Sequence, residues 1–144
     1  MVLVSGCLAG INCKYNGGNN FDERIFNLVK DGKAIPVCPE QLGGLKTPRN
    51  PAEQQNKDGK IVVYTAQGED VTLEYTRGAE EVLRIAKEFD IKEVIFQPRS
   101  PSCGKGLIYD GTFSKSKIEG NGITADLLIK NGIKVYMPEE YFSK

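Results

Sequence analysis

The chain has 144 residues, with 19 Lys and Arg against 19 Asp and Glu, and 40% of its residues are hydrophobic. This length fits a single domain over residues 1–144, which can bury roughly two-thirds of its unfolded surface without a disulfide or metal staple. The formal net charge of zero provides no basic face to attract nucleic acid, so we expect no nucleic-acid partner.

The N-terminus predicts a cytoplasmic protein. A strand pattern begins at Val2, with no cationic region and no long apolar run, so neither a signal peptide nor a membrane span is expected. In that reducing compartment the four cysteines are expected to be thiols, metal ligands or catalytic groups, and not structural disulfides. We expect a monomer or a homodimer without a membrane partner.

The first segments predict a strand, a helix and a second strand. Val2–Ser5 is short and apolar, as in a buried strand, and a loop rich in Gly and Asn follows it. The next apolar residues recur at helical spacing, with Asn20 or Asp22 as the cap and Gly32 as the stop. These positions are Phe21, Ile25, Leu28 and Val29. Ala34–Val37 completes a unit whose right-handed connection implies parallel strands.

The middle of the chain predicts a long irregular segment and then a helix. Regular periodicity disappears over residues 38–60, and long loops of this kind are usually functional or disordered. Ile61–Tyr64 predicts a short edge strand, and a helix begins at Asp70 or Thr72. The apolar positions of that helix are Tyr75, Ala79, Val82, Leu83, Ala86 and Phe89.

The last third predicts two strands and one more helix. Glu93–Gln97 is the third strand of the series, and residues 103–122 predict a mobile loop or a small hairpin. Thr124 is expected to cap a helix over Ala125–Lys130, and Ile133–Tyr136 forms the last strand. The whole pattern indicates a three-layer α/β domain of Rossmann or flavodoxin type. It has a mostly parallel four-stranded core sheet and a long irregular active-site loop.

Three cysteines follow three predicted strands. Cys7, Cys38 and Cys103 each lie just beyond a strand, where open α/β sheets bind ligands. The chain has no histidine and no closely spaced cysteine pair, which argues against a locally folded zinc module. Soft thiolates on separate loops suit an iron-sulfur cluster, and three ligands would leave one iron open. Each thiol alone could instead be a buried apolar residue, and Cys13 could be a fourth ligand, a supporting thiol or loop packing.

Polar residues beside these cysteines are candidates for catalysis and substrate binding. Glu40 could act as a general acid or base, or could merely complement the first turn of a helix. Ser100 and Ser102 could position a substrate or water, or could close the turn around Pro101. Three further side chains could donate to a polar ligand or could be solvated loop residues. They are Thr47, Arg49 and Arg99.

Six motifs together resemble domain-of-unknown-function family 523, whose characterised members are thiouracil desulfidases. The motifs are SGCLAG at residues 5–10, CKYNG at 13–17, VCPEQLGG at 37–44, TPR at 47–49, RSPSCG at 99–104 and YDGTF at 109–113. The likeness runs from about residue 2 to residue 136, which is nearly the whole chain.

The resemblance implies an enzyme that removes sulfur from a small thiolated base, with a [4Fe-4S] cluster held by Cys7, Cys38 and Cys103. The fourth iron would be free to bind the sulfur of a thiolated pyrimidine, and 2-thiouracil would yield uracil and sulfide without net redox change. Glu40 would be the acid/base, and either Ser100 or Ser102 its polar partner.

Other functions remain open at this point. The substrate could be another thiolated base, a nucleoside or a small thioamide. A non-enzymatic protein that binds a cluster or metal, as a sensor or carrier, is a second possibility. The third is a small α/β domain with buried thiols and no metal.

Overall fold

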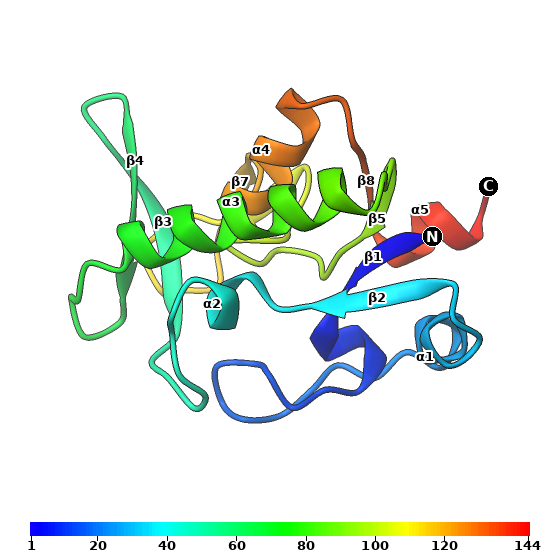
Figure 1. Cartoon of the computed structure of the whole chain (residues 1–144). Helices are drawn as coiled ribbons and strands as arrows, with labels where there is room; N and C mark the ends of the chain where they lie inside the picture. Colours follow the sequence, from blue (N-terminus) through cyan, green and yellow to red (C-terminus); the bar gives the residue numbers. More distant parts are fainter.

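Four parallel strands form the central sheet in the computed structural model, which describes residues 1–144 (Figure 1). They are β1 (Val2–Ser5), β2 (Ala34–Val37), β5 (Glu93–Ile95) and β8 (Lys134–Tyr136). Their order is β2-β1-β5-β8, and every neighbouring pair is parallel. Counting these core strands alone, the order is 2-1-3-4, which is typical of flavodoxin-like sheets. The predicted four-stranded parallel core is confirmed.

Helices cover both faces of this sheet, which gives three layers (Figure 1). The helices α1 (Glu23–Lys30) and α5 (Pro138–Phe142) pack on one face. The other face carries α3 (Thr72–Glu88) and α4 (Ile123–Lys130). None of the helices combines the length and the apolar character needed to cross a membrane.

The alternation of side chains along β1 explains the two cores. Leu3 points to the α3 and α4 side, where it packs with Val82 and Leu128. Val4 points to the opposite face, in the cluster that contains Ile25 of α1. All five side chains are fully buried, and each such burial contributes about 1.5–3 kcal/mol to folding. A strand buried on both faces therefore reads as a continuous apolar run.

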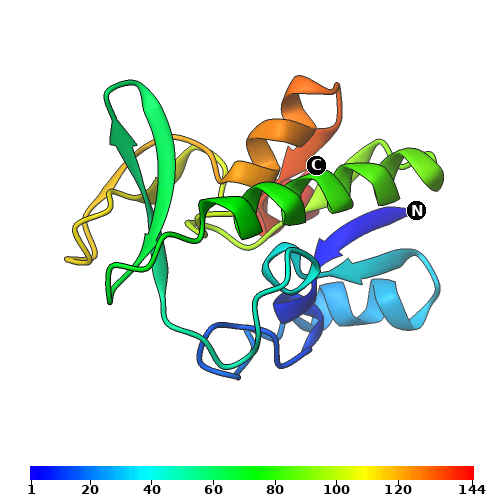
Figure 2. The same cartoon turned by 60° about the vertical axis from the view of Figure 1, so that its left-hand side comes forward.

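Two antiparallel hairpins extend from the α/β core. The first pairs β3 (Ala52–Lys57) with β4 (Lys60–Thr65), and the second pairs β6 (Leu107–Tyr109) with β7 (Lys117–Glu119). Figure 2 shows both hairpins at the same end of the molecule, beyond the sheet. The prediction of a loop or small hairpin over residues 103–122 resolves to the hairpin.

The expectation that residues 38–60 are irregular is wrong in two places. The one-turn helix α2 (Pro39–Leu42) follows β2 directly, and β3 occupies Ala52–Lys57. The sequence of β3 is AEQQNK, which has no apolar alternation, so a period-2 signal could not reveal it. Its partner β4 is accordingly in a separate hairpin and not at the edge of the core sheet.

Smaller differences concern helix ends and strand lengths. Gly122 precedes α4, so Thr124 lies inside the helix and does not cap it. The helix α5 escaped prediction because it is only five residues long. The third core strand ends at Ile95, two residues earlier than expected. At α1 the choice between two caps is decided in favour of Asp22, whose carboxylate accepts from the Arg24 backbone N–H at 3.0 Å.

Candidate active site

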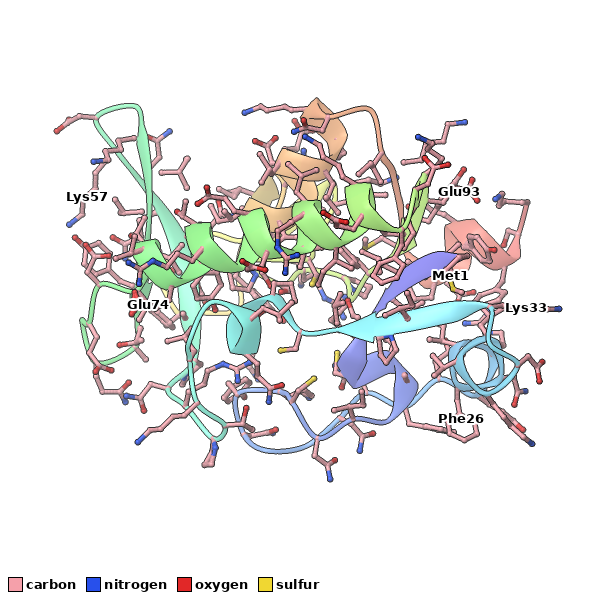
Figure 3. The ribbon with its side chains drawn as sticks, viewed as in Figure 1. Met1, Phe26, Lys33, Lys57, Glu74 and Glu93 are labelled. Atoms are coloured by element: carbon pink, nitrogen blue, oxygen red, sulfur yellow. The ribbon has the colours of Figure 1, made fainter.

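A cavity of about 680 Å³ opens at the carboxyl ends of the core strands. The segments after β1, β2 and β5 line it on the sheet side, and the two hairpins and Tyr75 of α3 contribute to the rest of the wall. All four cysteines of the chain line this cavity and none forms a disulfide. Figure 3 shows sulfur atoms gathered between the segment after β1 and α2.

The strand ends determine where the thiols lie. Cys7 belongs to the 3₁₀ turn η1 (Gly6–Ala9) directly after β1, and Cys38 is the residue before the first turn of α2. Cys103 belongs to the loop after β5. Parallel strands end at the same edge of a sheet. Cys38, which is 31 residues after Cys7, and Cys103, which is 65 residues after Cys38, therefore line the same cavity as Cys7.

Burial makes most of these thiols weak acids. It raises the pKa of Cys7 to about 11, with help from the nearby charges of Glu40 and Cys38. Burial also raises the pKa of the Cys103 thiol well above its usual range. A hydrogen bond from the Cys13 thiol lowers the pKa of Cys38 and raises that of Cys13. Cys38 is therefore the cysteine that ionises most readily.

Glu40 and the two candidate serines form one hydrogen-bonded chain. The Ser102 hydroxyl donates to Oε1 of Glu40 at 2.6 Å, and the oxygens of Ser100 and Ser102 lie 3.0 Å apart. The single proton of Ser102 is committed to Glu40, so Ser100 donates to Ser102. Ser100 lines the cavity, whereas Ser102 is completely buried behind it. Glu40 also lines the cavity, so its carboxylate faces the cavity directly and is in addition linked to it through the two hydroxyls.

Arg49 is held by the protein and not by solvent. Its Nη2 donates to the carbonyl oxygen of Cys13 at 2.9 Å and lies 3.5 Å from Oε2 of Glu40. Its Nη1 donates to the Thr47 hydroxyl at 3.0 Å. Arg49 lines the cavity but Thr47 does not, which favours a supporting role for Thr47 and not a direct contact with substrate. Arg99 is exposed, lines the cavity and has a left-handed backbone.

Close packing of two helices positions Glu40. A side-chain carbon at Gly78 of α3 would overlap the carbonyl oxygen of Pro39, and one at Gly43 would overlap that of Glu74. Because neither glycine has a side chain, α2 lies directly against α3. This contact sets the place from which Glu40 reaches Ser102.

The donor set fits a cluster better than a single metal ion. No three His, Cys, Asp or Glu side chains lie close enough together to hold one ion. The thiols nevertheless share a cavity, and a cubane cluster spaces its ligands more widely than a tetrahedral zinc ion does. Thiolate sulfur is also the donor that iron-sulfur clusters use.

Comparison with known proteins agrees with this geometry. The family model described as 2-thiouracil desulfurase matches residues 2–140. The chain belongs to this family. An uncharacterized protein of Bacillus subtilis (strain 168), YbbK, is 48% identical over 146 residues, which covers 97% of each chain. The solved structure of the [4Fe-4S]-dependent thiouracil desulfidase TudS superposes with a TM-score of 0.87 at 38% identity, covering 99% of this chain and 95% of that one.

Several residues of this 2-thiouracil desulfurase family member were not anticipated as part of the cavity. Gln97 has its side-chain oxygen 4.0 Å from the Cys7 sulfur, and its backbone N–H donates to the Ser5 hydroxyl at 2.8 Å. Gln54 of β3 does not line the cavity but supports its wall, because it donates to the carbonyl oxygen of Pro101 at 2.9 Å. Such polar residues carry no periodic signal, because their roles depend on segments distant in sequence.

The hairpin β6–β7 also contributes to the cavity of this family member. Tyr109, Phe113 and Lys115 line it, and the first two belong to the YDGTF motif. The YDGTF motif contributes to the family resemblance, but its residue types alone do not predict that Tyr109 and Phe113 line the cavity.

Proposed function

We propose that this protein hydrolyses the carbon–sulfur double bond of a thiolated pyrimidine, converting 2-thiouracil and water to uracil and sulfide without net redox change. The observation that carries this proposal is the meeting of three strand-end thiols and the Glu40–Ser102 pair at one cavity. Membership of the 2-thiouracil desulfurase family and the likeness to TudS support it.

Cys7, Cys38 and Cys103 are the proposed ligands of a [4Fe-4S] cluster. Their placement on three separate strand ends suits the wide spacing of cluster ligands. Such a cluster supplies an iron without a protein ligand, which is a soft Lewis acid suited to a thiocarbonyl sulfur. Thiols bind metal as thiolates, so Cys7 and Cys103 release protons when they bind, and Cys38 ionises first.

Cys13 has a supporting role in this proposal. Its carbonyl oxygen accepts from the Cys38 thiol at 3.7 Å and from Arg49 at 2.9 Å. It therefore orients one ligand and ties that ligand to the cation beside Glu40. On this basis Cys13→Ser retains the cluster, because the backbone carbonyl that contacts Cys38 and Arg49 is unchanged by the substitution.

Glu40 is the proposed general acid and base. A carboxylate can take a proton from the attacking water and return one to the departing sulfur. Glu40 lines the cavity itself, and a second route for protons runs from Ser100 at the cavity wall through Ser102 to Glu40. Ser100 is thus the serine that contacts substrate or water, and Ser102 positions the carboxylate.

The arginines have different parts in substrate binding. Arg99 is exposed at the cavity and can donate to a carbonyl oxygen of the pyrimidine substrate. Arg49 is engaged by Cys13, Thr47 and Glu40, so it keeps the carboxylate in place.

The first test is the iron and acid-labile sulfide content of protein reconstituted without oxygen. About four of each per chain, with a broad visible band, is the expected result. Cys38→Ala should then lose both cluster and turnover of 2-thiouracil. Glu40→Gln should keep the visible band and lose turnover by about 10²–10⁴-fold. Full activity of Glu40→Gln, or stoichiometric zinc in place of iron, contradicts the proposal.

The same assay separates the proposal from its alternatives. Release of sulfide from a panel of thiolated bases, nucleosides and thioamides identifies another substrate if 2-thiouracil is not the best one. A cluster that passes to an apo-acceptor protein, with no turnover on any member of the panel, indicates a carrier.

The proposed setting is the cytoplasm, where four unpaired thiols are maintained by the reducing conditions. The balanced charge agrees with a small-molecule substrate and with no nucleic-acid or membrane partner, in a monomer or homodimer. Size-exclusion chromatography with light scattering measures the oligomeric state directly.

A further inference from the structure

The tip of the hairpin β6–β7 lines the cavity but has no part in the proposed chemistry. Tyr109, Phe113 and Lys115 all reach the cavity from this segment. Figure 2 shows the hairpin beside β3 and β4 at the end of the molecule. A segment that lines an active site without a chemical role is a candidate for substrate recognition.

Glu53 of β3 attaches the tip of the hairpin to the rest of the protein. Its Oε1 accepts from the backbone N–H of Gly111 at 3.0 Å and from that of Phe113 at 3.2 Å. Gln55 adds a hydrogen bond from its Nε2 to the Gly111 carbonyl oxygen at 3.1 Å. Glu53 is only 9% exposed. A buried carboxylate is costly unless it is well satisfied, so these bonds to the loop are its compensation.

The backbone of this segment is strained in a way that demands such an attachment. Phe113 and Lys115 have φ values of 58° and 67°, although both carry side chains. A left-handed non-glycine residue costs of order 1–3 kcal/mol and persists only where the surroundings enforce it. At Gly111 a Cβ would lie 2.6 Å from the carbonyl oxygen of Gln54, so the loop is pressed onto β3. Strained residues of this kind cluster at ligand-binding sites.

The strained backbone holds a large apolar ring at the cavity. Phe113 is 36% exposed and lines the cavity, although its ring would be more stable if buried. A phenyl face is suited to a flat heterocycle, because offset stacking adds to the burial of apolar area. The ring is thus placed where a planar ligand can cover it.

We propose that Phe113 is a specificity-determining residue whose ring stacks on the heterocycle of the substrate, and that Glu53 is a positioning residue that holds it there through the backbone. This inference rests on the proposed function, because it takes the substrate to be a thiolated pyrimidine. It predicts that Phe113 and Glu53 affect substrate binding, whereas Glu40 affects the chemical step.

Steady-state kinetics with 2-thiouracil on the reconstituted protein test the role of the ring. Phe113→Leu keeps an apolar side chain but has no aromatic face, and should raise KM about two- to tenfold with little change in kcat. Phe113→Tyr restores the ring and should restore the KM. An unchanged KM in Phe113→Leu, or an equal defect in Phe113→Tyr, overturns the proposal.

The same measurement tests Glu53 as a clamp. Glu53→Ala should raise KM to a similar extent, and the double variant with Phe113→Leu should be no worse than Phe113→Leu alone, because both changes remove one stacking contact. Glu53→Gln keeps an oxygen that can accept both backbone N–H groups, so its KM should stay near that of the wild type. Additive increases in KM in the double variant contradict the clamp. A Glu53→Gln variant whose KM is raised as much as that of Glu53→Ala contradicts it as well.

A binding experiment provides a readout that does not depend on turnover. The chain contains no tryptophan, so Phe113→Trp introduces the only indole. Its emission should change in a saturable way when 2-thiouracil or uracil is added to the reconstituted protein. Phe26→Trp is the matched control, because Phe26 lies on α1 away from the hairpins (Figure 3).

The two levels of proposal fail differently in these experiments. If the wild type does not release sulfide from 2-thiouracil, the proposed function fails, whatever the fluorescence shows. If the wild type is active but the Phe113→Trp emission responds no more than that of the control, stacking at Phe113 is wrong and the proposed function stands.

Discussion

The Ser102 hydroxyl donates to the Glu40 carboxylate over 2.6 Å and joins two residues that are 62 positions apart in the sequence. Glu40 belongs to α2 after the second core strand, and Ser102 belongs to the loop after the third. Their meeting follows from the strand order, since β1 lies between β2 and β5 and all three end at the same edge. The acid/base candidate and the loop that carries Cys103 are therefore coupled directly.

The first prediction concerns this hydrogen bond. Ser102→Ala should lower kcat by about ten- to a hundredfold, because a buried hydrogen bond to a charged group contributes about 1.5–3 kcal/mol. The visible spectrum of the reconstituted protein should not change, since Ser102 is not a proposed ligand. Ser143→Ala, at an exposed serine near the C-terminus, is the control. A Ser102→Ala variant with wild-type kcat would show that Glu40 needs no partner.

The second prediction compares two ion pairs of very different burial. The pair of Arg49 and Glu40 has side-chain exposures of 8% and 15%, whereas that of Arg84 and Glu81 has 61% and 42%. Arg49→Ala should lower the free energy of unfolding by about 3 kcal/mol, because it leaves a carboxylate buried without its cation. Arg84→Ala should lower it by about 0.5 kcal/mol or less. Urea denaturation of both variants makes the comparison, and equal losses would contradict the structural role of Arg49.

The third prediction concerns the contact between α2 and α3. Gly78→Ala places a carbon where the Pro39 carbonyl oxygen lies, so α2 has to move and Glu40 moves with it. We expect a loss of about 1–3 kcal/mol in unfolding free energy, together with a lower kcat. Arg77→Ala, at the exposed neighbouring position of the same helix, should change neither. A stable and fully active Gly78→Ala protein would show that the helices can separate without cost.

The fourth prediction uses the lowered pKa of Asp22. Its carboxylate caps α1 and pairs with Arg24, which lowers its pKa in the folded state. The charged form is therefore favoured on folding, so its contribution is present above the ordinary carboxyl pKa near 4 and is lost as the pH falls through the lowered value. Asp22→Ala should destabilise by about 1 kcal/mol at neutral pH.

The measurement is the unfolding free energy of wild type and Asp22→Ala at about pH 7 and about pH 3. The difference between them should shrink on acidification. Asp22→Asn, which can still cap the helix, should lose less than Asp22→Ala at neutral pH. A difference that is constant or grows toward low pH would be inconsistent with the lowered pKa.

The core of the fold follows from local pattern and connection rules. Val2–Ser5 and Ala34–Val37 read as buried strands because they are apolar on both faces, and the helix between them requires a parallel pair. The hairpin strand β3 has the sequence AEQQNK and does not follow any such rule. Its Gln54 and Glu53 hold neighbouring loops in place through hydrogen bonds, which require polar side chains. The same polarity removes the apolar alternation by which a strand is predicted.

The positions of the cysteines could be predicted from the sequence, because a residue that follows a predicted strand must lie at the end of that strand. Cys7, Cys38 and Cys103 are of this kind. The two serines could not be separated in the same way. They are two positions apart on one loop, and only the packing of that loop buries Ser102 against Glu40 while Ser100 stays at the cavity.

Sequence by itself therefore determined the parallel core, the edge of the sheet at which the cavity opens, and the family resemblance, because these depend on periodicity, chain connection and motif spacing. Tertiary structure alone decided which serine meets Glu40, that Arg49 is engaged by the protein, and that Phe113 reaches the cavity. Those relationships arise between segments distant in the chain. They depend on side-chain contacts of a few ångströms, and no local pattern encodes such contacts.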